Sequence, residues 1–357
     1  MVINMKWEEN VRKVVPYVAG EQPNRPNMIK LNTNECPYPP APGVRKAAEN
    51  MESAALRLYP NSNAQPLVDE LAAYYGVKPE QVFVGVGSDD VLSMAFLTFF
   101  NSGKPVLFPD VTYSFYDVWA DLYRIPYHTC ALDENWHMNP EDYKQPNGGV
   151  IFPNPNAPTG VEEPQAMIEE ILQANPDVVV IVDEAYVDFG GTSALPLLKK
   201  YENLLVVQTF SKSRAMAGMR IGFGIGNEKL IHYLNDVKFS FNSYTMNLPS
   251  QVMGVEAVRD DAYFKATTAK IVATRERIKK ELNELGFTFP DSKANFIFAS
   301  HKEVPAEELF RALREADIYV RHWNKPRIAN SLRISVGTDE EMDRLIAFLK
   351  EYLEKRV

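Results

Sequence analysis

The sequence predicts an α/β protein built on a mostly parallel, doubly wound sheet. Between about residues 80 and 225, short apolar runs alternate with stretches of helical periodicity, and this alternation is typical of parallel strands joined by helices. The run 178–182 contains only valine and isoleucine, as expected for a strand buried on both faces. From residue 295 the pattern changes to strand, helix, strand, strand and helix, which predicts a smaller α+β unit.

The expected elements follow from local patterns along the chain. In the large sheet region we expect strands at 81–84, 106–108, 149–152, 178–182 and 204–207, and helices at 44–51, 66–75, 91–100, 164–174 and 230–237. A helical pattern covers 249–285. The final unit has expected strands at 295–299, 318–321 and 332–336, and expected helices at 305–316 and 340–355. Thr338 and Glu341 form a capping box for the last helix.

Composition excludes several classes of function. The 357 residues carry a net charge of −9 without a long basic run, which argues against nucleic acid or an anionic membrane as a partner. We find no apolar segment of about 18–20 residues, and the N-terminus lacks the apolar core of a signal peptide. Cys36 and Cys130 are isolated and the five histidines show no ligand spacing, so we expect no metal site. The cytoplasm is the expected compartment.

Polar residues gather where two buried strands end. Asp183 follows the strand 178–182, and Lys212 follows the strand 204–207 together with the hydroxyl residues Thr209 and Ser211. Binding sites in open α/β sheets lie at the carboxyl ends of strands. Together with Arg220, these groups would suit a phosphorylated cofactor with a cationic ring.

The same residues resemble a known motif. Asp-x-x-Tyr at 183–186, Ser-Lys at 211–212 and an arginine eight residues later are similar to the fold type I pyridoxal-5′-phosphate (PLP) aminotransferases. The resemblance implies that Lys212 forms a Schiff base with PLP and that Asp183 pairs with the pyridinium nitrogen. It implies that Tyr186 contacts the phenolic oxygen of the ring and that Arg220 holds the phosphate.

Further cofactor contacts are implied upstream. A Gly-Ser-Asp turn after the strand 81–84 resembles the turn that holds the PLP phosphate, through Ser88 and Asp89. Tyr113 matches the aromatic residue that stacks on the pyridine ring, although a core tyrosine is the alternative. The turn 154–160 reads Asn-Pro-Asn-Ala-Pro-Thr-Gly and resembles the aminotransferase turn whose amide, here Asn156, bonds the phenolic oxygen. Thr209 and Ser211 complete the implied cofactor set.

Other segments resemble the histidinol-phosphate aminotransferase family in particular. The stretch 31–37 is similar to its Leu-Asn-x-Asn-Glu-Asn-Pro opening, with Cys36 in place of the second asparagine. Tyr59 matches a tyrosine that reaches the cofactor phosphate of the other subunit, although a buried aromatic before a turn is equally compatible with the sequence. The resemblance implies a substrate set that comprises Arg333 for the α-carboxylate, Arg321 for a substrate phosphate, and Asn156, Tyr17 and Tyr244.

This resemblance implies an activity, an assembly and a division of the chain. The activity is amino-group transfer between L-histidinol phosphate and 2-oxoglutarate in histidine biosynthesis, with PLP as cofactor and Lys212 also moving the proton. The assembly is a homodimer. The division has an N-terminal arm and part of the small domain at 1–48, a large PLP-binding domain at 49–255 and a small C-terminal domain at 256–357.

Three alternative functions share most of these residues. An aromatic or broad-range amino-acid aminotransferase would keep every cofactor contact. A threonine-phosphate decarboxylase would keep the fold and the preference for phosphate. A PLP-binding regulatory domain would need a separate DNA-binding module, and the upstream sequence offers no basic segment of about 50 residues for one.

Overall fold

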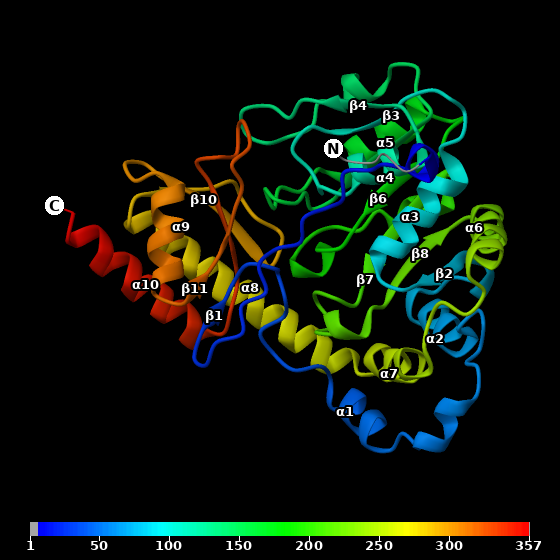
Figure 1. Cartoon of the computed structure of the whole chain (residues 1–357), viewed down its shortest axis with the longest axis horizontal. Coiled ribbons are helices and arrows are strands. Elements are labelled where there is room, and N and C mark those ends of the chain that lie inside the picture. The colour runs from blue at the N-terminus through cyan, green and yellow to red at the C-terminus, as the bar shows by residue number, and fades with distance from the viewer. Residues whose placement is uncertain (1–5, 357) are drawn as a thin grey trace.

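A seven-stranded sheet forms the centre of the larger part of the molecule (Figure 1). The computed structural model describes residues 6–356. The strand order is β2-β8-β7-β6-β5-β3-β4, and β8 alone runs antiparallel to its neighbours β7 and β2. This confirms the expected mostly parallel sheet. The strands are β2 (Val82–Gly85), β3 (Val106–Pro109), β4 (Tyr127–Cys130), β5 (Gly149–Pro153), β6 (Val180–Asp183), β7 (Leu204–Thr209) and β8 (Gly222–Gly226).

Helices cover both faces of this sheet, because the central strands are apolar on both sides. Ile181 and Leu205 pack under α3 (Ser88–Phe99), α4 (Tyr116–Tyr123) and α6 (Glu228–Phe241). Val180 and Val206 face the opposite way and pack against α5 (Gln165–Ala174). The alternation along single strands follows the period of two of the β-backbone. We call the sheet with these helices the large domain.

A third cluster covers the β2 end of the sheet. It joins Phe223 and Ile225 of β8 to three further helices, which are α1 (Pro42–Glu49), α2 (Gln65–Tyr75) and α7 (Leu248–Arg259). Helix α2 ends at Gly76, which takes the left-handed conformation that glycine adopts readily at such ends.

The small domain is a second, antiparallel sheet of order β12-β13-β10-β9 with two helices. Its strands are β9 (Phe287–Thr288), β10 (Phe296–His301), β12 (Arg321–His322) and β13 (Leu332–Ser335), and its helices are α9 (Ala306–Glu315) and α10 (Asp339–Glu354). Both bonds of the predicted Thr338–Glu341 capping box are present. The N-terminal segment joins this domain, because β1 (Ile29–Lys30) pairs with β11 (Ile318–Tyr319).

Two predicted elements are divided in the structure. The strand expected at 318–321 is wrong as a single element, because the chain changes sheets at Val320: β11 pairs with β1, and β12 pairs with β13. The helical pattern expected over 249–285 is present, and the structure divides it into two helices. Asp260 ends α7, and its side chain accepts a hydrogen bond from Tyr263 to begin α8 (Asp261–Glu284).

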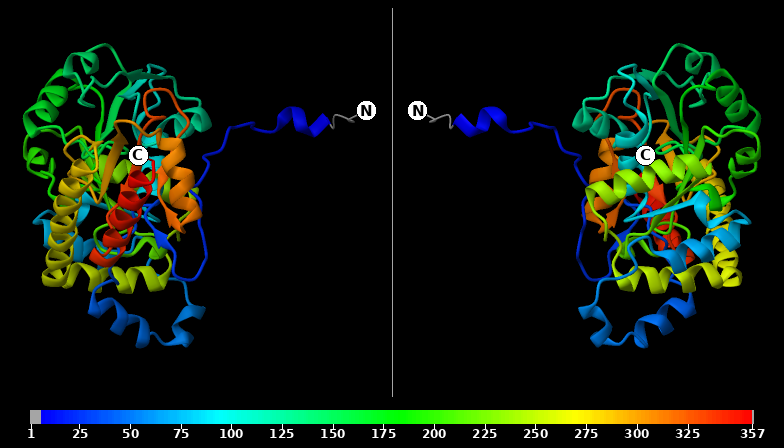
Figure 2. Two further views of the ribbon diagram at one scale, coloured as in Figure 1. Left: turned by 90° about the vertical axis from the view of Figure 1, so that its left-hand side faces the viewer. Right: turned by 90° about the vertical axis from the view of Figure 1, so that its right-hand side faces the viewer.

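Helix α8 runs from beneath the large domain to the small domain (Figure 1). The predicted boundary between residues 255 and 256 falls inside the preceding helix α7, and we keep the three-part division as a proposal. The 3₁₀ helix η1 (Lys6–Asn10) stands clear of the rest of the molecule in both views of Figure 2. Residues 1–5 of the predicted arm lie outside the described part of the chain.

Candidate active site

The carboxyl edge of the large sheet brings most of the predicted cofactor residues together. Asp183 closes β6, Thr209 closes β7, and Lys212 follows three residues later. These side chains line a cavity of about 450 Å³, which we call the lysine cavity. Its walls include every predicted cofactor residue except Asn156 and Tyr59, namely Ser88, Asp89, Tyr113, Asp183, Tyr186, Thr209, Ser211, Lys212 and Arg220.

The Lys212 amine is held by the N-terminal segment. Its Nζ donates a 2.9 Å hydrogen bond to the carbonyl oxygen of Thr33, and it lies 5.9 Å from the centre of the Tyr186 ring. The Tyr186 hydroxyl accepts a 3.0 Å bond from Asn34 Nδ2. The segment that follows β1 therefore closes the lysine cavity from the side of the small domain. Cys36, at the position where the resembling family has asparagine, packs beside Tyr186 in an apolar cluster.

Asp183 is a buried carboxyl, and within residues 6–356 it forms no ion pair. Its Oδ2 accepts a 3.0 Å bond from Tyr116 and its Oδ1 a 3.3 Å bond from the amide of Ala185. Burial raises its pKa to about 7, although the Tyr116 bond lowers the pKa in part. A buried carboxylate of this kind is stabilised by a positive partner. The site therefore suits a ligand with a protonated nitrogen.

Arg220 and the start of α3 form a concave anion site. Arg220 donates to Asp89 Oδ2 at 3.3 Å and to Ser211 Oγ at 3.4 Å, and the Ser211 hydroxyl bonds Thr209 at 3.0 Å. Ser88 is the first residue of α3, so its end of the helix presents free amides and a positive dipole. A guanidinium, two hydroxyls and a helix N-terminus fit a phosphate group.

Two glycines allow the parts of this anion site to approach closely. Gly87 has a φ of +87°, and a Cβ there would lie 2.5 Å from Arg220 Nη2. A Cβ on Gly222 would lie 2.2 Å from the carbonyl carbon of Gly87 and from the amide nitrogen of Ser88. The first residue of β8 therefore touches the backbone at the N-terminus of α3.

Asn156 and Tyr113 differ in how fully their side chains are hydrogen-bonded. Asn156 Nδ2 donates to Val111 O and Thr159 Oγ1, both at 3.0 Å, whereas its buried Oδ1 has no hydrogen-bond partner among the described residues. Tyr113 donates to Asp89 at 2.7 Å, and burial followed by the charge of Asp89 raises its pKa. Contact between Asn156 and the phenolic oxygen of a cofactor stays a prediction, because its nitrogen is already used.

A second, smaller cavity of about 120 Å³ adjoins the first and shares Thr33, Tyr113 and Ala157 with it. We call it the arginine cavity, because Arg321 and Arg333 both line it. The two residues are direct partners across the antiparallel pair β12–β13. Like charges placed directly opposite each other destabilise a sheet unless an anion lies between them.

Trp323 supports both guanidinium groups. Its ring centre lies 5.2 Å from the guanidinium carbon of Arg321 and 5.2 Å from that of Arg333. Arg333 donates to Asn32 O at 2.9 Å, and within the described part of the chain its buried Nε has no hydrogen-bond partner. Burial, followed by the charge of Arg321, lowers the pKa of Arg333. The arginine cavity is therefore an anion site with unused donors.

The three remaining predicted residues divide into two groups. Tyr17 lines the arginine cavity and stacks on Phe115 at 4.2 Å between ring centres. Tyr59 and Tyr244 instead lie on the surface, 82% and 46% exposed, with their rings 4.7 Å apart. Neither of these two tyrosines lines the lysine or the arginine cavity of its own chain.

Sequence reasoning missed Tyr116, Thr33 and Trp323. Tyr116 is the first residue of α4 and Tyr113 lies outside that helix, so the two share no helical face and no local pattern pointed to Tyr116. Trp323 lies one residue beyond the end of β12, so strand alternation does not place its side chain. Thr33 acts through its backbone carbonyl, and side-chain patterns give no signal for such a contact.

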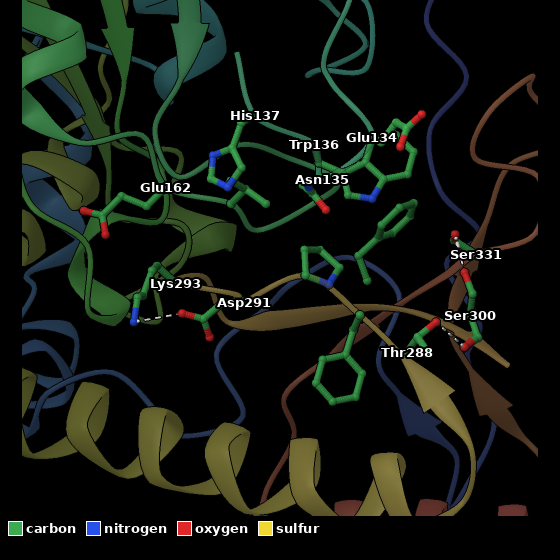
Figure 3. Close-up of a pocket in the computed structure, with 14 residues that line it drawn as sticks. Glu134, Asn135, Trp136, His137, Glu162, Thr288, Asp291, Lys293, Ser300 and Ser331 are labelled. Carbon is green, nitrogen blue, oxygen red and sulfur yellow. Dashed lines mark hydrogen bonds and ion pairs between the residues drawn. The ribbon is translucent and has the colours of Figure 1, made fainter. Parts of the chain in front are cut away.

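A third hollow lies between the domains, away from these residues. Figure 3 shows the loop 134–137 of the large domain facing β9, β10 and Lys293 of the small domain across a cleft of about 710 Å³. Its polar groups are paired in part, for example Lys293 with Asp291 at 3.3 Å. Within residues 6–356 we find no cluster of three potential metal ligands. No helix in this part of the chain is long and apolar enough to cross a membrane.

The groups in the two cavities fit PLP and an anionic substrate. Asp183 would pair with a ring nitrogen, the Arg220 site would hold a phosphate, and Lys212 offers an amine between them. The arginine cavity adjoins this set and has free donors for a second anion. An amine beside groups that fit a phosphorylated cofactor, with further anion-binding donors next to it, is the arrangement expected in an enzyme that acts on amino compounds.

Comparisons with known proteins agree with this class. Residues 26–349 match the family described as aminotransferase class I and II. The structure also resembles solved histidinol-phosphate aminotransferases in fold. The protein from Sinorhizobium meliloti, solved in complex with pyridoxal-5′-phosphate, has a TM-score of 0.83 at 23% identity and 92% coverage of each chain. The protein from Clostridium acetobutylicum has a TM-score of 0.83 at 22% identity, with 92% of this chain and 100% of that chain covered.

Comparison with curated relatives identifies a particular family within this class. The chain is 52% identical over 352 residues to histidinol-phosphate aminotransferase of Lactococcus lactis subsp. cremoris (strain MG1363), with 99% of each chain covered. It is 48% identical over 349 residues to that of Clostridium botulinum (strain Langeland / NCTC 10281 / Type F), with 98% of this chain and 99% of the relative covered. The chain belongs to the histidinol-phosphate aminotransferase family of class I and II aminotransferases.

Proposed function

We propose that this protein is a PLP-dependent aminotransferase that interconverts L-histidinol phosphate plus 2-oxoglutarate with imidazole acetol phosphate plus L-glutamate, in histidine biosynthesis. The observation that carries the choice of substrate is the direct pairing of Arg321 with Arg333 at the cavity beside Lys212. One α-carboxylate needs one arginine. A phosphate with about −1.5 to −2 charges and three acceptor oxygens uses both.

When bound, the cofactor would supply an electron sink for the bonds at the substrate α-carbon. Lys212 would bond the cofactor between turnovers, and its amine would carry a proton between the substrate α-carbon and C4′ of the cofactor. Asp183 would stabilise a positive charge on the ring nitrogen. Arg220, Ser211 and Ser88 would hold the cofactor phosphate, and Tyr186 would contact the ring oxygen.

The arginine cavity would serve both half reactions. Arg333 would bind the α-carboxylate of glutamate or one side of the substrate phosphate, and Arg321 would add the second set of donors. Tyr17 would cover the substrate from the N-terminal segment, since it already lines the cavity against Phe115. Asn156 would bond the phenolic oxygen of the cofactor ring only if its Nδ2 gave up its bond to Val111 O or to Thr159 Oγ1.

The test is a panel of amino donors assayed with wild type and Arg321→Ala. We expect histidinol phosphate to be the best donor and the variant to lose roughly ten- to a hundred-fold in kcat/KM for it, because a charge-assisted hydrogen bond contributes about 1.5–3 kcal/mol. Phenylalanine and tyrosine should lose far less. Preference for the aromatic acids with equal losses would indicate a broad-range aminotransferase, and carbon dioxide release from threonine phosphate would indicate a decarboxylase.

We also propose a homodimer with shared active sites. The rings of Tyr59 and Tyr244 contact each other at the surface in a tilted arrangement, and Trp7, Val15 and Val18 of the N-terminal segment are 64%, 82% and 77% exposed. Apolar surface of this kind is typical of a covered interface. Mixing a Lys212→Ala variant with a Tyr59→Ala variant should restore part of the activity through heterodimers. A fully active monomer in analytical ultracentrifugation would exclude shared sites.

A further inference from the structure

Arg327 makes a set of contacts that joins the two domains beside the arginine cavity. Its Nη1 donates to Asp110 Oδ2 at 2.6 Å, and its Nη2 donates to the carbonyl oxygens of Leu132 at 2.8 Å and Asp133 at 3.1 Å. The other oxygen of Asp110 accepts a 3.0 Å bond from the amide of Leu132. Hydrogen bonds from a charged donor are stronger than those between neutral groups, and Arg327 forms several of them.

The loop that carries Arg327 is anchored at further points. We call residues 323–330 the latch loop. Ile328 is 6% exposed and packs into the core cluster of the large domain, although it belongs to a loop between two strands of the small domain. His322 bonds the carbonyl oxygen of Ala329 at 2.8 Å and so closes the base of the loop. The latch loop is therefore attached to the small domain at its base and to the large domain at its tip.

Strained backbone lies on both sides of this contact. Arg327 has a φ of +68° and Trp136 a φ of +71°, and the guanidinium carbon of Arg327 lies 5.2 Å from the Trp136 ring. Non-glycine residues keep such conformations only where their surroundings hold them, and they concentrate at functional contacts. Trp136 also lines the interdomain cleft, on the side of the large domain (Figure 3).

The walls of the arginine cavity are the parts that this contact joins. Trp323, Lys325 and Ile328 line the cavity from the latch loop, and Asp110 lines it from the large domain. Trp323 in turn contacts both arginines. We propose that the Arg327–Asp110 contact is an interdomain latch that positions Trp323, Arg321 and Arg333 for the anionic group of the substrate. Arg327 is a positioning residue, and this role rests on the proposed function for the identity of that anion.

The first test is a double-mutant cycle of Asp110→Asn and Arg327→Gln with histidinol phosphate as donor. Each single variant should raise KM about five- to fifty-fold and change kcat less than threefold, because the chemistry at Lys212 is untouched. The KM of the double variant should lie within about twofold of the KM of the more impaired single variant, because both substitutions remove the same contact. Arg311→Gln, which breaks an exposed ion pair with Glu307 in the same domain, is the matched control and should behave as wild type.

The second test needs no turnover and so separates the latch from the choice of substrate. Asp110→Asn keeps Arg327 as a trypsin site but removes the charged partner of its side chain, which keeps only its bonds to the carbonyl oxygens of Leu132 and Asp133. We expect cleavage after Arg327 to accelerate at least tenfold relative to cleavage after Arg45 in the same digest, with mass spectrometry as the readout. Equal cleavage ratios in wild type and variant would overturn the latch whatever the substrate. Two outcomes would overturn the positioning role even if cleavage is faster. In the first, the KM increases of the two single variants multiply in the double variant; in the second, kcat falls as much as KM rises.

Discussion

The lysine cavity takes most of its residues from one sheet edge, whereas the arginine cavity takes its residues from segments far apart in the sequence. Asp183, Thr209 and Lys212 follow neighbouring strands of one rigid sheet. Tyr17, Asp110 and Arg333 come from the N-terminal segment, the large domain and the small domain. A cofactor that stays bound can use a fixed cradle, while a substrate that must enter and leave is better served by walls that can separate.

The largest effect is expected when the amine of Lys212 is removed from the lysine cavity. We expect Lys212→Ala to lower kcat by about 10⁴-fold or more, because both the nucleophile and the general base are lost. Lys212→Arg should be equally inactive, since it keeps the charge but cannot give up a proton. Borohydride reduction of wild type followed by peptide mapping should find the cofactor on Lys212. A label on another lysine would place the chemistry elsewhere.

Two neighbouring carboxyl groups allow a sharper test of the cradle. Asp183 lines the lysine cavity, whereas Glu184 is buried against Ser193, Ala194 and Gln208. Asp183→Asn should weaken cofactor binding roughly ten- to a hundred-fold, because one charge-assisted bond is lost. Glu184→Gln should instead lower the free energy of unfolding by about 1–3 kcal/mol and leave cofactor affinity within threefold.

Cofactor titrations followed by visible absorbance, and urea unfolding of both variants, measure these two effects. The comparison fails if the Glu184 variant loses cofactor affinity as strongly as the Asp183 variant. It also fails if both variants retain wild-type affinity, because the cradle would then not depend on the carboxyl group at the end of β6.

A third expected effect is a dependence of stability on pH in the cofactor-free protein. Burial raises the pKa of Asp183 from 3.8 to about 7, so between these pH values the folded chain binds more protons than the unfolded chain. The free energy of unfolding therefore falls as pH rises through this range, by up to about 1.4 kcal/mol for each unit of the shift. Glu184, also with a pKa of about 7, adds a slope of the same sign.

Urea unfolding of cofactor-free protein at pH 5 and pH 8 is the measurement. Asp183→Asn should flatten the dependence but leave the contribution of Glu184. Adding PLP to wild type should flatten it as well, because a positive partner lowers the pKa of Asp183. An unchanged slope in the variant would show that Asp183 is ionised in the empty cradle.

The sequence predicted the lysine cavity well because its residues sit beside strong local signals. A buried strand ends at Asp183 and another at Thr209, and parallel neighbours bring such ends to one edge. Arg321 and Arg333 were also predicted, and their strands proved to be neighbours. Arg327 was not predictable in this way. Its partners lie 194 to 217 residues away along the chain and include two backbone carbonyls.

The division at Val320 was missed for a related reason. Residues 318–321 are uniformly compatible with a strand, and only the positions of β1 and β13 decide that the chain changes sheets there. Asp260 likewise interrupts the helical pattern with a cap whose effect depends on one side-chain bond. Periodicity reports which face of an element is apolar, but it does not report which sheet the element joins.

The close approach of Gly222 to the first turn of α3 has a consequence for how the family can diversify. Any side chain at this position would meet the backbone at 2.2 Å, and backbone atoms cannot turn aside as a flexible side chain can. Substitutions that change the preferred amino donor are therefore not expected at the Gly222 end of the lysine cavity, where the phosphate would bind. The latch loop has exposed residues on both sides of Ile328, so inherited change in donor preference is expected to accumulate there first. A library randomised at 324–326 should yield altered donor profiles more often than one randomised at 222–224.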